Sequence, residues 1–206
     1  MKLTVYCLLF SFLIASCSSN VKRVMVVAKG STTIDTDTKT ITLKDGGGSE
    51  EKTADFNQSG TLSLKLKKED GELKIDLPEN GLYIVNGKND TIIGSYQKYG
   101  EVPKEEKTVS QVQLKQGIDS LIALTQNKNI AAANRNFYIL PYQAIKITNN
   151  IDAFIVAPYH RMTSIEKEAG KEPEVYRFWS IKEIRETIEK LTAMTKATPP
   201  PPPAKK

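Results

Sequence analysis

The chain has 206 residues, with 29 Lys and Arg against 24 Asp and Glu, which gives a formal charge of +5. Its 39% hydrophobic and 26% charged residues are too apolar for a wholly disordered chain and too polar for a protein with several membrane spans. One His and two Cys exclude zinc fingers, disulfide-dense scaffolds and most His-rich metal sites, so we expect no metal and no cofactor.

The N-terminal segment has the layout of a secretory signal. Lys2 precedes an apolar run of about eleven residues, whereas a membrane-spanning helix needs roughly twenty. The segment Ile14-Ala15-Ser16-Cys17 resembles the lipobox that ends the type II signal peptide of bacterial lipoproteins. The resemblance implies diacylation of the Cys17 thiol, cleavage between Ser16 and Cys17, and acylation of the new amine. An ordinary secretory signal with an incidental Cys, or an uncleaved anchor, is the alternative.

The lipid would fix the protein to a membrane, because each buried CH₂ contributes about 0.8 kcal/mol. Ser18, and not Asp, follows Cys17, which in the enteric version of the family's sorting rule favours the outer membrane; other phyla sort differently. Cys7 leaves with the signal and Cys17 is consumed by lipid, which excludes a Cys nucleophile. We therefore expect a lipid-anchored protein of the bacterial cell envelope, with the membrane as one partner.

The residues that follow are typical of short strands. A β-branched run from Val24 to Val27 predicts the first strand, and a Thr-rich pattern continues it through Ile34 to Leu43. Residues 46–55 begin with three glycines and predict a flexible loop. Two alternating segments then predict a β-hairpin with one buried face. Its apolar positions are Leu62, Leu64, Leu66, Leu73, Ile75 and Leu77.

The second half of the chain contains an internal repeat. Residues 75–98 align without a gap on residues 138–161, with 6 of 24 positions identical. Each copy predicts a strand, a Leu-Pro turn, a second strand, an Asn-containing turn and a third strand. An amphipathic helix follows each copy, begun by capping-box patterns at Ser110 and Ser180.

We therefore predict an α+β fold of mainly antiparallel strands with two amphipathic helices and a tandem duplication of a βββα unit. Chance similarity of short amphipathic segments is the alternative. The last segment carries five prolines and predicts an exposed polyproline II rod or a plain disordered tail. The predicted divisions are a signal peptide at 1–16, the anchored N-terminus and first strands at 17–72, the two units at 73–127 and 136–196, and the proline-rich tail at 197–206.

Few residues offer catalytic chemistry. The one imidazole is His160, and the sequence has no G-x-S-x-G elbow or other nucleophile motif. His160 aligns with Gln97 in the repeat, which favours a structural role and leaves it a weak candidate for a small envelope hydrolase. Residues 46–48 lack the Lys and Ser/Thr of a phosphate loop, and residues 35–46 lack the Gly and Glu of a calcium loop.

The repeat places an aromatic residue and a cation at equivalent positions, Tyr96 with Lys98 and Tyr159 with Arg161. These residues are candidates for binding sugars or an anionic polymer, although tyrosines packed at strand ends are the structural alternative. Export and the absence of a basic stripe argue against nucleic acid. We expect a non-enzymatic interaction or scaffold protein that meets an envelope protein or glycan, with a glycan- or small-ligand-binding module as the alternative.

The excess of positive charge concentrates at the two ends of the chain. Lys2 leaves with the signal, and the remaining excess is accounted for by Lys22, Arg23 and the two C-terminal lysines. Lys22 and Arg23 lie within six residues of Cys17, which predicts that they meet anionic lipid head groups.

Overall fold

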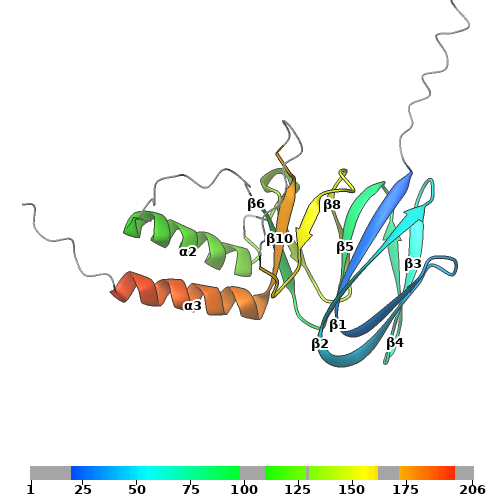
Figure 1. Ribbon diagram of the computed structural model, residues 1–206, viewed down its shortest axis with the longest axis horizontal. Coiled ribbons are helices and arrows are strands. Elements are labelled where there is room, and N and C mark those ends of the chain that lie inside the picture. The colour runs from blue at the N-terminus through cyan, green and yellow to red at the C-terminus, as the bar shows by residue number, and fades with distance from the viewer. Residues whose placement is uncertain (1–19, 98–109, 129, 162–171, 198–206) are drawn as a thin grey trace, which may run out of the picture.

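A computed structural model of the protein describes residues 20–97, 110–128, 130–161 and 172–197 (Figure 1). The predicted signal peptide, Cys17, Lys98 and residues 198–206 of the proline-rich tail lie outside these residues. Within them the fold is α+β, as predicted, with mostly antiparallel strand pairs and two α-helices. No helix in the described ranges combines the length and apolarity needed to cross a bilayer.

The strands form a six-stranded and a four-stranded sheet, in the orders β4-β3-β2-β1-β5-β8 and β7-β6-β10-β9. The six-stranded sheet contains β1 (Val21–Asp35), β2 (Thr40–Asn57), β3 (Leu62–Lys68), β4 (Gly71–Leu77), β5 (Gly81–Gly87) and β8 (Ala144–Thr148). The four-stranded sheet contains β6 (Ile92–Gln97), β7 (Asn136–Ile139), β9 (Phe154–Val156) and β10 (Val175–Ser180). The helices are α2 (Gln111–Thr125) and α3 (Ile181–Ala197), and the 3₁₀ turn η2 (Ala132–Asn134) precedes β7.

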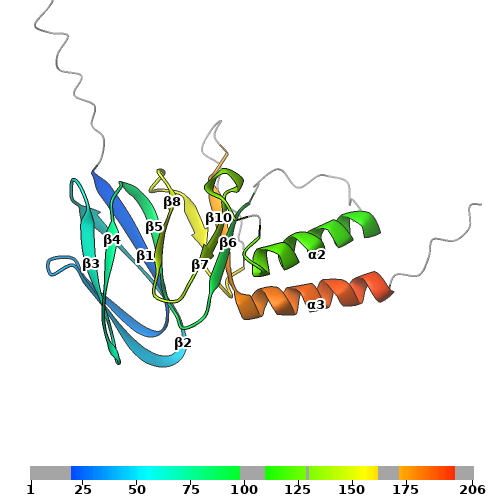
Figure 2. The same ribbon diagram turned by 180° about the vertical axis from the view of Figure 1, so that it is seen from behind.

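The six-stranded sheet, the four-stranded sheet and the two helices follow one another across the molecule (Figures 1 and 2). Three apolar clusters hold them together. The six-stranded sheet curls around the first cluster, to which all of its strands contribute. Its other face packs on the four-stranded sheet through Val27, Ile84 and Phe178, and the two helices cover the outer face of that second sheet. β1 and β5 contribute to two clusters, which explains their unbroken apolar runs, since a strand buried on both faces does not alternate.

β1 and β2 form a long curved hairpin (Figure 1), and the irregularity in its pairing lies at Gly30. The register shifts between Lys29 and Ser31, because residues 45–48 of β2 bulge out of the ladder. The prediction of a flexible loop was therefore wrong: the glycines sit in a bulge, and residues 49–57 continue as a strand. The pairing depends on a partner strand far away in sequence, which local composition does not report.

Side chains hold this bend in place. The Lys52 ammonium donates to the Thr32 carbonyl at 2.9 Å, and the Thr32 N–H donates to the Glu50 carboxylate. Within the described residues β5 pairs with β1 only as far as Ala28. The N–H and C=O groups of Thr32 therefore meet no described strand on the β5 side of β1. The two side chains supply the bonds that a buried backbone requires.

The locally encoded elements are confirmed. β3 and β4 pair as the predicted hairpin, with Leu64 opposite Ile75 on the buried face. Ser110 forms the predicted capping box at the start of α2. At the start of α3 the Ser180 hydroxyl accepts from the Glu183 N–H at 3.1 Å, as a helix cap does.

The order of elements recurs in the two repeat segments. β4, β5, β6 and α2 correspond to β7, β8, β9 and α3, except that β10 is inserted before α3. The segments do not form separate sheets, because β5 pairs with β8 and β6 pairs with β7. The duplication of a βββα unit stays a prediction.

Candidate functional site

A groove of about 530 Å³ lies between the margins of the two sheets, where β2 and β9 come close together. Its volume falls within the range of ligand pockets, roughly 300–1,000 Å³. Met25, Ala153 and Ile155 line it and also pack against the cluster between the sheets, so the groove is the open mouth of that core. The polar lining comes from Arg23, Thr53, Asp55 and Asp152.

Arg23 is the one cation among the residues that line the groove. Its Nε and Nη2 donate to the two oxygens of Asp55 at 2.7 Å each, as a bidentate pair. Its Nη1 donates to the Asp152 carboxylate at 2.9 Å and to the Ile151 carbonyl at 3.0 Å. Arg23 thereby ties β1 to β2 and to the turn before β9, and the three side chains together carry a net charge of −1.

The groove keeps Asp55 ionised. The hydrogen bond from Arg23 lowers the pKa of Asp55, while partial burial acts in the opposite direction. The same bond is the largest cause that raises the pKa of Arg23. An ionised carboxylate accepts hydrogen bonds and has no proton to give, so this pair suits recognition of cations and donors better than general acid catalysis.

We expect the pair to contribute stability that depends on pH. Because the folded-state pKa of Asp55 lies below its unfolded value, the contribution is present above about pH 4 and is lost as the pH falls through the folded-state pKa. Arg23→Gln should raise the pKa of Asp55 in an NMR titration and flatten the loss of unfolding free energy between about pH 5 and 3.

The loss at pH 7 should not exceed about 1 kcal/mol, because the Asp55 side chain is 41% exposed and solvent screens the pair. Arg185→Gln removes an exposed arginine from α3 and serves as the control, with an unchanged titration of Asp55. An Asp55 pKa that does not respond to Arg23→Gln would contradict the assignment.

A second arginine, Arg135, belongs to a network that holds the β9 side of the groove in place. The Arg135 guanidinium lies 3.7 Å from the centroid of the Tyr96 ring, donates to the Tyr176 hydroxyl at 2.9 Å and pairs with Glu174. The Glu174 carbonyl accepts from the Phe154 N–H at 2.8 Å. Burial, followed by the hydrogen bond to Glu174, raises the pKa of the Tyr176 hydroxyl. This network fixes the start of β9 against β10.

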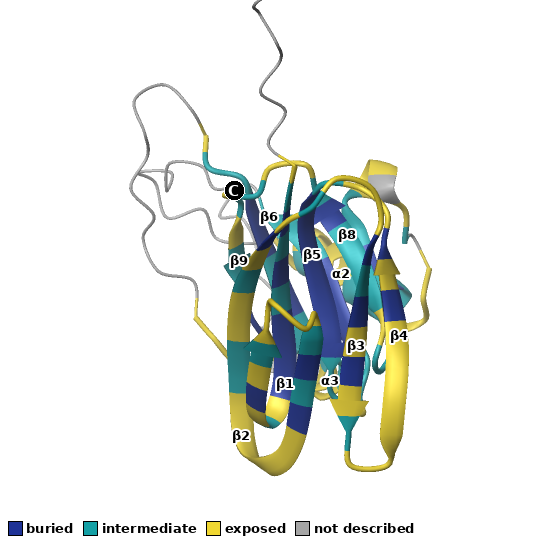
Figure 3. Ribbon diagram, turned by 90° about the vertical axis from the view of Figure 1, so that its right-hand side faces the viewer, coloured by how far each residue is buried: buried dark blue, intermediate teal, exposed yellow. Residues whose placement is uncertain are grey.

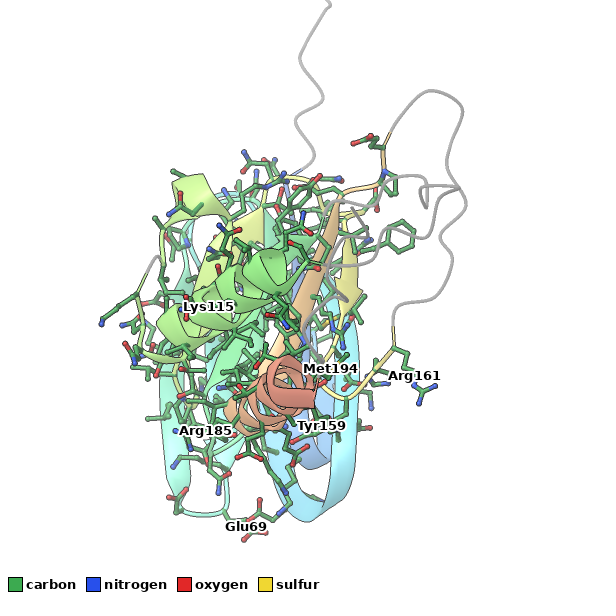
Figure 4. The ribbon with its side chains drawn as sticks, turned by 90° about the vertical axis from the view of Figure 1, so that its left-hand side faces the viewer. Glu69, Lys115, Tyr159, Arg161, Arg185 and Met194 are labelled. Atoms are coloured by element: carbon green, nitrogen blue, oxygen red, sulfur yellow. The ribbon has the colours of Figure 1, made fainter. Side chains whose placement is uncertain are left out.

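The predicted ligand-binding residues are not gathered into one site. Tyr96 pairs with Tyr176 on β10, whereas the Tyr159 hydroxyl lies 2.7 Å from the Ser180 hydroxyl at the other end of that strand. Ser180 lies four residues along the strand from Tyr176, which is about 13 Å. The Arg161 side chain points away from the domain (Figure 4). The two tyrosines therefore do not form a joint binding face.

His160 lies at the surface, with 57% of its side chain exposed. Its Nε2 is 3.8 Å from a Glu51 oxygen and its Nδ1 is 3.3 Å from the Pro158 carbonyl. Neither contact directs the imidazole towards a Ser or Thr hydroxyl. In the ranges that the structure describes, no three His, Cys, Asp or Glu side chains are grouped as metal ligands.

Lys22 and Arg23 do not form the basic patch that was expected beside the lipid. Lys22 is completely buried, and its ammonium donates to the Gln58 carbonyl at 2.9 Å and to the Asn80 side chain at 3.0 Å. Burial, followed by the charge of Lys146, lowers the pKa of Lys22. The expectation was wrong because β1 begins at residue 21, so both cations are internal to a strand.

The groove itself was missed at the level of sequence. Arg23, Asp55 and Asp152 come from three distant segments, and no motif links them. Phe154, which is 49% exposed and lines the groove with Asp152, stands in a short apolar run, so nothing in the sequence marks its ring as exposed. Comparison with family models, curated proteins and solved structures gave no match to this chain.

Proposed function

We propose that this protein is a lipid-anchored, non-enzymatic interaction module of the bacterial cell envelope, and that the groove between β2 and β9 is its binding surface. The anchor is the predicted acylation of Cys17. Recognition is assigned to the Arg23, Asp55 and Asp152 cluster and the apolar lining beside it.

The length of the tether supports an anchored domain. β1 begins at Val21, and three residues separate it from Cys17. A fully extended chain covers at most about 14 Å over that interval. An acylated Cys17 would therefore hold the folded domain close to the bilayer, with the Arg23 end of β1 nearest to the surface.

The chemistry of the groove carries the binding role. Asp152 is 79% exposed at the rim and Phe154 presents its ring beside it, so polar and apolar contacts are both open to a partner. Arg23 holds both carboxylates in fixed positions through three hydrogen bonds, and a fourth goes to the Ile151 carbonyl. A rigid set of ionised acceptors around an apolar floor is suited to binding.

The anchor has a direct test. Cys17→Ser removes the thiol that is acylated, so incorporation of labelled palmitate into the protein should be lost completely and the protein should leave the membrane fraction. Cys7→Ser removes the other thiol of the chain and is the matched control, with labelling retained. Persistent labelling of Cys17→Ser would overturn the anchored role.

A glycan is the second candidate for the bound partner, favoured by the exposed Phe154 ring beside the Asp152 carboxylate. Aromatic rings contact the apolar faces of sugars, and a carboxylate accepts bonds from their hydroxyls. Binding of a cell-wall oligosaccharide that is lost in Phe154→Ala would support this candidate.

A further inference from the structure

We propose that the groove binds an extended basic peptide, which adds as a strand along residues 49–57 of β2. The inference rests on the binding role proposed above and assigns the chemistry of the partner. It is carried by the free edge of β2, by the direction of that edge's main-chain groups, and by the charges that face them.

Residues 49–57 of β2 have a strand on one side only. They pair with β1, while the pairing of β2 with β3 covers residues 40–42 alone. In the described residues no strand pairs with the remaining edge. Figure 3 shows this exposed and half-exposed margin along the side of the molecule. β2 therefore ends the sheet here, although it is an internal strand at its other end.

The main-chain groups of alternate residues point out from this edge. The Gln58 N–H donates to the Asn20 carbonyl at 3.1 Å, which marks these two residues as a hydrogen-bonded pair of the antiparallel ladder. Such pairs alternate with pairs whose N–H and C=O groups face outwards. The register is unbroken from there to residue 49, so Glu51, Thr53 and Asp55 direct their main-chain groups away from β1.

The opposite wall of the groove is a second free edge. β9 pairs with β10, and within the described chain no strand pairs with its other side. The Phe154 N–H faces β10, since it donates to the Glu174 carbonyl, and the alternation turns the main-chain groups of Ile155 outwards. Extended polypeptide is the ligand that such edges recognise, through main-chain hydrogen bonds.

The charges on this edge of β2 are mostly acidic, because Lys52 is the one cation among residues 49–57. β4, at the margin of the same sheet, carries the exposed charges Glu72, Lys74 and Asp76, as strands protected from edge pairing do. On β2 the corresponding cation, Lys52, is bound to the Thr32 carbonyl at the bend. It is therefore not held out over the edge.

The charges of the groove select a basic partner. Asp55 and Asp152 flank one cation, Arg23, whose donors are already bonded to Asp55, Asp152 and the main chain. Glu51 lies four residues before Asp55 along the same edge of β2. The four side chains carry a net charge of −2. Lys or Arg side chains on the groove-facing side of an added strand would face these carboxylates, and apolar side chains on that same side would meet Met25 and Phe154.

To test the proposal, a phage library of random nine-residue peptides is panned against the full wild-type chain and against the Thr53→Pro variant. Thr53 points its N–H away from β1, so proline removes a donor of the edge without removing a bond of the ladder. The best peptide is then synthesised and its dissociation constant is measured for the wild type, Thr53→Pro, Asp152→Asn and Asp76→Asn. The last variant removes the same charge from β4 and is the matched control.

We expect the recovered peptides to carry Lys or Arg at alternate positions. Their binding should be weakened about tenfold by Thr53→Pro, and also by methylation of alternate peptide amides, because each change removes main-chain hydrogen bonds. Asp152→Asn should also weaken binding, and Asp76→Asn should not. If Thr53→Pro is unfolded by circular dichroism, the methylated peptides make the same comparison on the wild type.

Strand addition would be overturned if no peptide were recovered or if the recovered peptides were acidic. It would also be overturned if neither Thr53→Pro nor methylation changed the dissociation constant. Binding of a cell-wall oligosaccharide that depends on Phe154 and not on Thr53 would overturn it in favour of a glycan site. The proposed function would survive that result, because its anchor is measured separately by palmitate labelling of Cys17.

Discussion

Replacing Gly30 with alanine is expected to lower the free energy of unfolding by about 3 kcal/mol or more. Gly30 has φ +89°, which L side chains rarely adopt, and an added Cβ would lie 2.2 Å from the Lys44 carbonyl oxygen and 2.5 Å from the Gly46 nitrogen. Both neighbours are backbone atoms, so no side chain can rotate away. Backbone strain and overpacking each contribute roughly 1–3 kcal/mol. Urea denaturation of the purified protein measures the loss.

The glycine-rich bulge provides its own control. A Cβ added to Gly47 would meet no heavy atom within 4 Å, and this glycine does not have a positive φ. Gly47→Ala should therefore leave the unfolding free energy within about 0.5 kcal/mol of the wild type. If Gly30→Ala were as mild as Gly47→Ala, the bend in the β1–β2 hairpin would have to be placed elsewhere.

The second large effect concerns Gly94, which lies directly opposite Phe178 in the pairing of β6 with β10. A Cβ on Gly94 would lie 2.1 Å from the Phe178 ring. The ring is completely buried and stacks on Phe137, so it has little room to move. Gly94→Ala should lower the unfolding free energy by about 1–3 kcal/mol, as overpacked cores do.

A double-mutant cycle isolates the contact between these two residues. In a Phe178→Leu background, Gly94→Ala should cost less than it does alone, because the ring that it meets has been removed. Gly117→Ala is the control of opposite sign: this glycine lies in α2 with open space around it, and alanine should stabilise by roughly 0.5–1 kcal/mol. Strict additivity in the cycle would show that the ring is not the obstacle.

The elements predicted correctly are those whose signals are local. Alternation specified the β3–β4 hairpin, and Ser110 with Gln113 specified the start of α2. β10 was not predicted, since its mixed aromatic and polar residues show no clean alternation. Residues 49–57 of β2 have weak strand propensity of their own and become a strand because β1 pairs with them.

The groove depends even more on tertiary structure. Arg23 appears in the sequence as half of a dibasic pair near the predicted anchor, and only the fold brings Asp55 and Asp152 to its guanidinium. Lys22 likewise has the sequence context of a surface cation until Gln58 and Asn80 are placed around its ammonium. Tyr96 and Tyr159 occupy equivalent places in the repeat, but the insertion of β10 gives them different neighbours.

The central place of β1 has a mechanical consequence. The chain enters the domain at Val21, and over residues 22–28 β1 is bonded to β2 on one side and to β5 on the other. Tension applied to the N-terminus along the strand would load these two ladders in shear, so many hydrogen bonds would have to break together instead of peeling one by one. Forced unfolding is governed by the unfolding rate. If the proposed anchor and the proposed partner are both in place, the domain would therefore resist unfolding under tension and transmit that tension to the partner in the groove.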